Sequence, residues 1–420
     1  MKKTANVKFN DVTKLYEVIY SKKEVIPNHI TDAMAEVLLM QKDLEYYCYD
    51  DCVAHITDKG PKQLSTVQLK GALNDCMTIR EETGDDGVNY RHPKNDEVDI
   101  LRNSPKVKNG LPQLRLYTKS PLFDQDWHFY GLRGFRASSG IYYDGPVVEP
   151  KQTTEYIDKV LGGFNFKGEV DRVNFIGMVL TGLTMPHWIG KHGFLLINGN
   201  KPGVGKTLLA RVLGLLVERK NPPTMRFEKW ESELDRQICG RLRTGQRTII
   251  LDNAKGASAS SEVLESLITS EVMSFRPLGR TEPYERENDV IFCVTANGLG
   301  ISEDLGRRSV PMELEYHGDV HQKEYKIPDL ESFILDHYTM ILAEFAGMVI
   351  KWIEQGKPIP SDYAKHSVSQ EWAKTIDGIL RANGYEGFLS NMESALNNID
   401  LDFKRRSEEH TSELQSPNTI

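Results

Sequence analysis

Phe194-Leu-Leu-Ile-Asn-Gly-Asn-Lys-Pro-Gly-Val-Gly-Lys-Thr207 joins a short apolar run to a glycine-rich turn. The apolar run, residues 194–197, predicts a buried strand, and the Gly/Pro/Asn residues after it predict a turn. A helix is expected next, because apolar residues then recur at helical spacing: Leu209, Val212, Leu213 and Leu216. A strand, a glycine-rich loop and a helix that opens on Gly-Lys-Thr form the context in which a phosphate-binding loop occurs.

This loop predicts a site for ATP and Mg²⁺. Glycines let successive backbone N–H groups converge on phosphate oxygens, and the helix N-terminus adds its partial positive charge. We expect Lys206 to reach the β- and γ-phosphates and the Thr207 hydroxyl to ligate Mg²⁺. The predicted nucleotide-binding residues are Gly199, Asn200, Lys201, Pro202, Gly203, Val204, Gly205, Lys206, Thr207 and Leu208.

Asn200 is a departure from the usual pattern of such loops, which carry their first glycine at this position. The glycine stands one place earlier, at Gly199. Because asparagine tolerates left-handed backbone angles better than most residues, we expect the loop to form with Asn200 in this place.

Length, charge and cysteine content bound the class of protein. The chain has 420 residues, enough for two or three domains, and a formal net charge of −8, which argues against a uniformly basic surface but not against a local basic channel. Its five cysteines lack the spacing of a disulfide framework, which favours a reducing cytoplasm. The longest apolar stretch, residues 175–190, is interrupted by Pro186 and His187, and the polar N-terminus resembles no secretory signal, so no membrane partner is expected.

The last residues differ from the rest of the chain. Residues 406–416 read like one frame of a sequencing adapter, so we interpret 406–420 as an artefact and exclude it from the fold. The eleven residues 406–416 carry one Arg and three Glu, so without them the net charge changes from −8 to −6.

Three domains are expected in the remaining chain: a mixed α/β region over 1–150, an α/β nucleotide-binding domain with a parallel sheet over 151–325, and a helical region over 326–405. The first region shows strand patterns at 114–118 and 141–143, many turns, and no long periodic helix. A helical lead-in ends at Pro186, since Val173, Ile176, Val179, Leu180 and Leu183 recur at helical spacing.

Two groups of residues in the first region allow either a functional or a structural interpretation. Cys48, Cys52 and His55 are spaced like zinc ligands, but no fourth ligand follows at finger-like spacing, and half-buried structural cysteines are the favoured account. A second group could stack on single-stranded bases, although core packing beside a solvated face is favoured there too: Trp127, Phe129, Tyr130, Arg133 and Arg136.

The second motif of the nucleotide-binding domain is Arg247-Thr-Ile-Ile-Leu-Asp-Asn253. A buried β-branched strand that ends in an acid supplies the carboxylate that a Mg²⁺ shell needs, so Asp252 is the predicted metal residue. Asn253 follows where many such enzymes carry a second acid. Asparagine can orient water but cannot accept its proton, so the general base is left unidentified.

A hairpin is expected between strands at 272–278 and 290–295. Its exposed tip would carry Arg280, Tyr284 and Arg286, which could grip a nucleic-acid backbone and stack on bases. Three glutamates dilute this charge, so a solvated hairpin without a ligand stays an equal alternative.

The strand that starts at Val290 ends in Thr-Ala-Asn297, and Asn297 is suited to contact the attacking water or a phosphate oxygen. Arg307 and Arg308 follow shortly after. An arginine at a subunit boundary can stabilise charge on a transferred phosphoryl group. Beyond the domain, residues 333–352 predict one helix that stops at Gly356, and 371–380 predict another.

The succession Gly-Val-Gly-Lys-Thr, Ile-Leu-Asp-Asn, Thr-Ala-Asn and Asp-Leu-Gly-Arg-Arg resembles AAA+ ATPases of the superfamily-3 type. More narrowly, it is similar to the primase/helicase-like replication ATPases of phages, plasmids and integrated mobile elements, over roughly residues 95–400. The resemblance implies a P-loop core, a hexameric ring on single-stranded DNA, and nucleotide sites between subunits. It also implies a cytoplasmic location, in a bacterial cell or phage-infected host, with a primase or initiator protein as partner.

Carried over to this chain, the resemblance makes Lys206 and Thr207 the phosphate loop and Asp252 the Mg²⁺ acid, with Asn253 beside it. It makes Asn297 the sensor and Arg307 or Arg308 the finger. The main hypothesis is therefore an ATP-hydrolysing DNA helicase or translocase. The alternative is an ATP-binding switch or loader that assembles replication proteins without unwinding, and a phosphoryl-transfer kinase fits the motifs less well.

Overall fold

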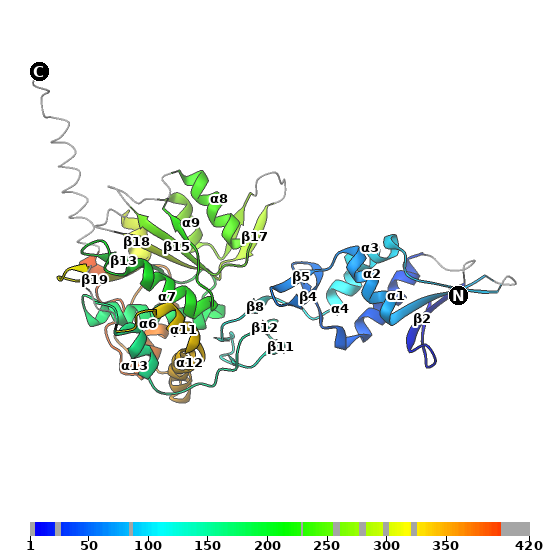
Figure 1. Cartoon of the computed structure of the whole chain (residues 1–420), viewed down its shortest axis with the longest axis horizontal. Helices are drawn as coiled ribbons and strands as arrows, with labels where there is room; N and C mark the ends of the chain where they lie inside the picture. Colours follow the sequence, from blue (N-terminus) through cyan, green and yellow to red (C-terminus); the bar gives the residue numbers. More distant parts are fainter. Residues whose placement is uncertain are drawn as a thin grey trace, which may run out of the picture. The chain divides into compact units, whose positions relative to one another are not determined.

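The structure is a computed structural model, and it describes residues 5–21, 27–83, 87–227, 230–254, 261–276, 283–296, 302–320 and 326–395. The chain forms two compact units (Figure 1). Unit 1 comprises Met1–Thr118 with Gly134–Tyr142, and unit 2 comprises Lys119–Arg133 with Tyr143–Ile420.

Unit 1 is a mixed α/β body with a four-stranded sheet in the order β1-β2-β6-β7. Strands β2 and β6 are parallel, and the two outer pairs are antiparallel. Two three-stranded sheets, β3-β4-β5 and β11-β12-β8, accompany it. The strands are β1 Asn6–Asn10, β2 Leu15–Ser21, β3 Tyr46–Tyr49, β4 Cys52–Thr57, β5 Gly60–Gln63, β6 Met77–Glu82, β7 Val88–Arg91, β8 Leu116–Thr118, β11 Gly134–Arg136 and β12 Ile141–Tyr143. The helices are α1 Pro27–Met40, α2 Thr66–Cys76, α3 Asn95–Asn103 and α4 Pro105–Gly110.

The expected strands near 114–118 and 141–143 are confirmed as β8 and β12. The expectation that this region lacks a long periodic helix is wrong, because α1 spans fourteen residues. Its buried residues Ile30, Met34 and Leu38 follow one another every four positions, which is the spacing of one helix face.

Unit 2 is built on a five-stranded sheet, all parallel, in the order β14-β15-β18-β13-β19. Two small antiparallel pairs, β9-β10 and β16-β17, lie outside it. The strands are β9 Leu122–Phe123, β10 Phe129–Tyr130, β13 Phe194–Gly199, β14 Thr224–Arg226, β15 Thr248–Ala254, β16 Val272–Phe275, β17 Tyr284–Glu287, β18 Ile291–Ala296 and β19 Ser309–Leu314. The helices are α5 Glu155–Leu161, α6 Glu169–Leu183, α7 Lys206–Glu218, α8 Glu231–Leu242, α9 Glu262–Thr269, α10 Glu303–Arg308, α11 Leu330–Asp336, α12 Tyr338–Glu354 and α13 Gln370–Ala382.

Both faces of the parallel sheet are covered, and alternate residues of the three central strands β13, β15 and β18 belong to different cores. In β13, Leu195 and Ile197 pack with the helices α6, α7, α12 and α13, whereas Phe194 and Leu196 pack with α8 and α9. Figure 1 shows α8 and α9 on one side of the sheet and α6, α7 and α13 on the other. The central strands are therefore mostly apolar, and polar groups accumulate where these strands end.

The predicted strand–loop–helix of 194–216 is confirmed as β13 and α7, and the lead-in helix as α6. The helix expected over 333–352 is broken instead, because α11 and α12 meet at His337 with a bend of 74°. The compact units are also cut differently from the predicted domains. Residues 143–150 belong to unit 2, and the helices beyond 326 share one core with α6 and α7.

Among the described residues, no single helix has both the length and the apolar composition to cross a bilayer. Only α11 and α12 taken together pass that test, across their 74° bend.

A buried carboxylate ties the C-terminal helices to the rest of unit 2. Glu344 of α12 is 2% exposed, and its carboxylate accepts hydrogen bonds from the backbone N–H groups of Tyr156 and Ile157, both at 2.9 Å. The Thr153 hydroxyl donates to the same carboxylate at 2.7 Å. Glu344 thereby caps the N-terminus of α5 from a distant part of the chain, because these N–H groups have no partner within their own helix.

We expect Glu344→Ala to lower the free energy of unfolding by about 2–4 kcal/mol, since it leaves buried helix N–H groups without an acceptor. Urea unfolding measures the effect. The control is Glu354→Ala on the same helix, because Glu354 is exposed and accepts only from the Gln152 side chain among the bonds seen here. Equal losses of stability in the two variants would contradict the capping role.

Candidate nucleotide site

A glycine-rich loop, residues 199–205, connects the end of β13 to the start of α7. Gly203 and Gly205 have φ angles of 82° and 108°, a left-handed region that side chains rarely adopt. At Gly199 the constraint is space, because a Cβ would lie 2.7 Å from Cγ2 of Val204. The backbone conformation therefore requires Gly203 and Gly205, and close packing against Val204 favours glycine at position 199.

The expected reason for Asn200 is wrong. Eight described non-glycine residues have a positive φ, and Asn200 is not among them. The loop therefore forms without placing this asparagine in the left-handed region. Its side chain is exposed and bonds to the backbone of Tyr316.

Lys206 is the first residue of α7 and is 7% exposed. Its Nζ donates to the carbonyl oxygen of Lys201 in the same loop, at 3.3 Å. Burial lowers the pKa of the Lys206 ammonium, and the Asp252 carboxylate acts in the opposite direction. The Lys206 ammonium therefore lies close to the N–H groups that open α7, and these positive groups together favour binding of an anion.

Asp252 is the point at which three elements of the site meet. The Thr207 hydroxyl of α7 donates to Asp252 Oδ1 at 2.8 Å, and the Thr295 hydroxyl of β18 donates to the same oxygen at 2.5 Å. Asp252 and Thr295 lie near the carboxyl ends of neighbouring parallel strands, where the register pairs Leu251 with Val294. The structure thus brings together the predicted residues Lys206, Thr207 and Asp252.

Thr295 is a member of this group that sequence reasoning did not assign to the site. The available signal was its place at the end of an apolar strand, two residues before Asn297. Asn297 and Arg280 lie outside the described residues, and for Asn253 the structure describes the backbone alone, as part of β15.

A cavity of about 230 Å³ adjoins the glycine-rich loop at Val204 and Gly205. Apolar side chains from three segments form part of its wall: Val160, Phe164, Leu208, Ile327 and Pro328. Charged groups at its rim include Arg211, whose guanidinium pairs with Glu331 at 2.9 Å. The cavity is large enough for part of a small ligand and combines apolar walls with a few polar groups, as ligand sites usually do.

Arg307 and Arg308 lie at the opposite ends of the strands, the amino ends, here called the amino edge of the sheet; the carboxyl ends form its carboxyl edge. They end α10, which leads directly into the amino end of β19, whereas the glycine-rich loop follows the carboxyl end of β13. Strands β13 and β19 run parallel in register over six residue pairs, so roughly 17 Å of sheet separates the two edges. The arginines therefore lie far from Lys206 of the same chain.

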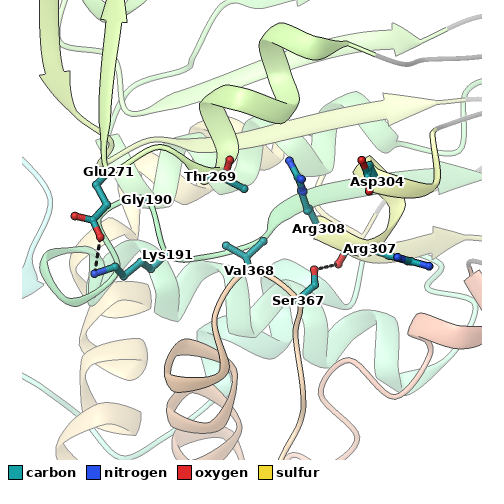
Figure 2. Close-up of a pocket in the computed structure, with 9 residues that line it drawn as sticks. All are labelled: Gly190, Lys191, Thr269, Glu271, Asp304, Arg307, Arg308, Ser367 and Val368. Carbon is teal, nitrogen blue, oxygen red and sulfur yellow. Dashed lines mark hydrogen bonds and ion pairs between the residues drawn. The ribbon is translucent and has the colours of Figure 1, made fainter.

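The two arginines border a cavity of about 440 Å³ (Figure 2). Arg308 Nη1 donates to the carbonyl oxygen of Glu265 at 2.8 Å, so α9 holds its guanidinium. Arg307 is 58% exposed and forms an ion pair with Glu303. On another wall of the cavity, Lys191 pairs with Glu271 at 2.7 Å.

A segment beyond α12 contacts the end of α10, which carries these arginines. His366 is buried, with Nε2 3.1 Å from the carbonyl oxygen of Ser309 and Nδ1 accepting from the backbone N–H of Val368 at 3.3 Å. The Ser367 hydroxyl donates to the carbonyl oxygen of Arg307 at 2.6 Å (Figure 2). Burial lowers the pKa of His366 to about 4. A neutral imidazole matches both bonds, since one nitrogen must donate and the other accept.

The predicted hairpin differs from the observed one. Strand β16 pairs with β17, so Tyr284 and Arg286 lie on a strand and not at a tip, and residues from 291 onward enter the parallel sheet as β18. The Arg286 guanidinium is 15% exposed, pairs with Asp289 at 2.7 Å and donates to the carbonyl oxygens of Leu242 and Gln246. The Tyr284 hydroxyl donates to Leu242 as well. Both side chains thus contact the body of unit 2.

The candidate base-stacking group packs within unit 2 for the most part. Trp127 stacks on His187 with ring centroids 3.9 Å apart, and Tyr130 is buried. Arg133 pairs with Asp144 at 2.8 Å. These contacts favour the structural interpretation.

The three candidate zinc ligands do not converge. Cys48 pairs with Val53 across β3 and β4, and Cys52 pairs with Tyr49, so the two cysteines lie on opposite faces of the hairpin. Elsewhere in the described chain, Asp124, Asp126 and His128 lie close enough to share an ion. The Asp124 carboxylate there already accepts from the backbone N–H groups of Asp126 and His128, as a turn residue does.

No family model matches the chain, and no curated protein sequence matches it significantly. Solved structures of the C-terminal region of NrS-1 are similar to it at 15% identity. The A-form apo structure has a TM-score of 0.46, and a second apo structure, of residues 305–718, has a TM-score of 0.45. Each of these two matches covers 88% of this chain and 74% of the solved NrS-1 chain. At this identity and TM-score, the similarity establishes no common activity.

We expect the free energy of unfolding to fall between pH 7 and pH 5, partly through His366. The ordinary histidine pKa is 6.5 and that of folded His366 is about 4, so in this window the unfolded chain binds a proton that the folded chain does not. The expected contribution of this residue is about 2 kcal/mol.

Urea unfolding at the two pH values tests this expectation. His366→Gln should show a smaller fall than the wild type, while burial of His187 and His192, which also lowers their pKa values, leaves part of the fall in place. His317→Gln is the control, because the His317 side chain is 82% exposed. A wild-type fall in His366→Gln would contradict the assignment.

Proposed function

We propose that unit 2 binds ATP with Mg²⁺ at the carboxyl edge of its parallel sheet. The observation that carries this proposal is the convergence of the Thr207 and Thr295 hydroxyls on Asp252, beside a buried Lys206 that opens a helix behind a glycine-rich loop. Hydroxyl and carboxylate oxygens are the ligands that Mg²⁺ prefers, and a helix N-terminus with a lysine favours phosphate.

The strand order also supports a ligand site at the carboxyl ends of the strands. From β13 the chain crosses to β14, the outer strand on one side of the sheet, and comes back through β15 to β18. From β18 it then crosses to β19, which lies on the other side of β13. Ligands of open α/β sheets bind at such a reversal of order, outside the carboxyl ends of the strands. The glycine-rich loop follows β13 at this point.

In this site Lys206 would hold the β- and γ-phosphates, and Thr207 with Asp252 would hold the metal. Bound Mg²⁺ supplies positive charge between the phosphate oxygens. The apolar cavity beside Val204 would receive the base or ribose, since it adjoins the loop and has Phe164 and Leu208 in its wall.

We propose further that the chain is an ATP-hydrolysing AAA+ motor of the superfamily-3 type, which acts on single-stranded DNA as a ring in the replication of a phage, plasmid or mobile element. The position of Arg307 and Arg308 is the observation that supports a ring. These side chains border a cavity at the amino edge, too far from Lys206 to serve it, so they would serve the site of a neighbouring copy. The proposed location is the cytoplasm, with a primase or initiator protein as a further partner.

One observation favours the alternative function, a switch or loader that binds ATP without unwinding DNA. Tyr284 and Arg286, two of the three expected DNA contacts, bond to the body of unit 2. Steady-state ATP turnover by the full chain, with and without single-stranded DNA, separates the two functions. Stimulation by DNA supports the motor, and ATP binding without stimulation supports the switch.

We expect Lys206→Ala to weaken binding of a fluorescent ATP analogue on the order of 100-fold, because the phosphates lose their charge-assisted partner. Lys365→Ala, an exposed lysine of the same unit, is the control and should bind normally. Melting temperatures confirm that both variants fold. Undiminished binding by a folded Lys206→Ala protein would contradict the proposed site.

Arg308→Ala and Arg307→Ala should retain ATP binding but lose turnover, if each arginine serves a neighbouring copy. Mixing Arg308→Ala with Lys206→Ala should then restore part of the turnover, because some interfaces combine an intact loop with an intact arginine. Turnover of the mixture that never exceeds the sum of the two variants would argue against sites shared between copies.

A further inference from the structure

The side chain of Asn200 bonds to the backbone of a distant residue in a two-way pair. Its Nδ2 donates to the carbonyl oxygen of Tyr316 at 3.1 Å, and the backbone N–H of Tyr316 donates to its Oδ1 at 3.2 Å. The backbone N–H of Asn200 also donates to the carbonyl oxygen of Leu314 at 3.2 Å. A glycine at this position could make the last bond but neither of the first two.

Other loop residues contact the same segment, residues 316–320, here called the strap. Lys201 Nζ donates to the carbonyl oxygen of Gly318 at 2.7 Å and lies 5.5 Å from the centre of the Tyr316 ring. At Gly203, an added Cβ would lie 2.8 Å from Cγ1 of Val320. The strap therefore lies along the glycine-rich loop over several residues.

One further hydrogen bond connects these contacts to Lys206. The carbonyl oxygen of Lys201 accepts from Lys206 Nζ at 3.3 Å, and Lys201 is the residue next to Asn200. The position of the Lys201 peptide thus depends on the bonds that its neighbour and its own side chain make with the strap.

We propose that Asn200 is a positioning residue, which holds the glycine-rich loop against the strap so that the loop amides and Lys206 are preorganised for a triphosphate. This proposal rests on the proposed nucleotide site and goes beyond it, because it assigns a role to the residue that departs from the usual loop pattern. Preorganisation raises affinity because the loop loses less conformational freedom when the ligand binds.

The test compares Asn200→Gly with the wild-type full chain. Glycine is the residue that such loops usually carry, so it supports the loop backbone and removes only the pair with Tyr316. We expect roughly tenfold weaker binding of a fluorescent ATP analogue, a nearly unchanged melting temperature without nucleotide, and faster hydrogen exchange in a peptide covering residues 314–320. The matched control is Asn103→Gly in unit 1, where the amide bonds to the nearby carbonyl oxygen of Asp99.

The outcomes separate the positioning role of Asn200 from the proposed nucleotide site. Binding by Asn200→Gly that equals or exceeds the wild type overturns the positioning role, and so does unchanged exchange of the strap. A lower melting temperature with normal affinity reduces Asn200 to a purely structural residue and also overturns it. If the wild type itself binds no nucleotide, the proposed function fails, whereas the exchange experiment still decides whether Asn200 holds the strap.

Discussion

Burial of both faces of a five-stranded parallel sheet is the constraint on which unit 2 depends. Each of the three central strands must supply apolar side chains to two cores at once, as Leu195 and Leu196 do on successive positions of β13. Polar chemistry is thereby confined to the two edges of the sheet. The glycine-rich loop and Asp252 occupy the carboxyl edge, and the arginine pair occupies the amino edge. The separation of these groups is a consequence of the strand length.

At the carboxyl edge, one carboxylate oxygen connects two strands and a helix. Asp252 belongs to β15, Thr295 to β18 and Thr207 to α7, and both hydroxyls donate to Asp252 Oδ1. Asp252 is partly buried, and the two hydroxyl donors offset the loss of water around its carboxylate. Under the proposed function, the same oxygen atoms are those that a bound Mg²⁺ would take as ligands.

The C-terminal part of the chain contacts elements at both the carboxyl and the amino ends of the sheet strands. Glu344 of α12 caps α5, whose residue Val160 lines the cavity beside the glycine-rich loop. At the amino ends of the strands, His366 and Ser367, which lie between α12 and α13, bond to the backbone at the end of α10. The helices beyond residue 326 therefore form one mechanical body with the sheet.

The sequence by itself determined the elements whose signal is local. The apolar run before a glycine-rich turn predicted β13 and α7, and the acid after an apolar strand predicted the position of Asp252 at the end of β15. Lys206 and Thr207 could be placed beside that acid because parallel strands end at a common edge. These predictions succeeded because periodicity and turn chemistry act over a few residues.

Only the tertiary structure decided which distant segments meet. It paired β16 with β17 instead of β18, broke the expected long helix at His337, and brought Thr295 to Asp252. It also replaced the backbone explanation of Asn200 with a side-chain bond to Tyr316, more than a hundred residues away. Strand register, helix bends and side chain-to-backbone bonds of this kind depend on packing between remote parts of the chain, for which a single sequence carries no local pattern.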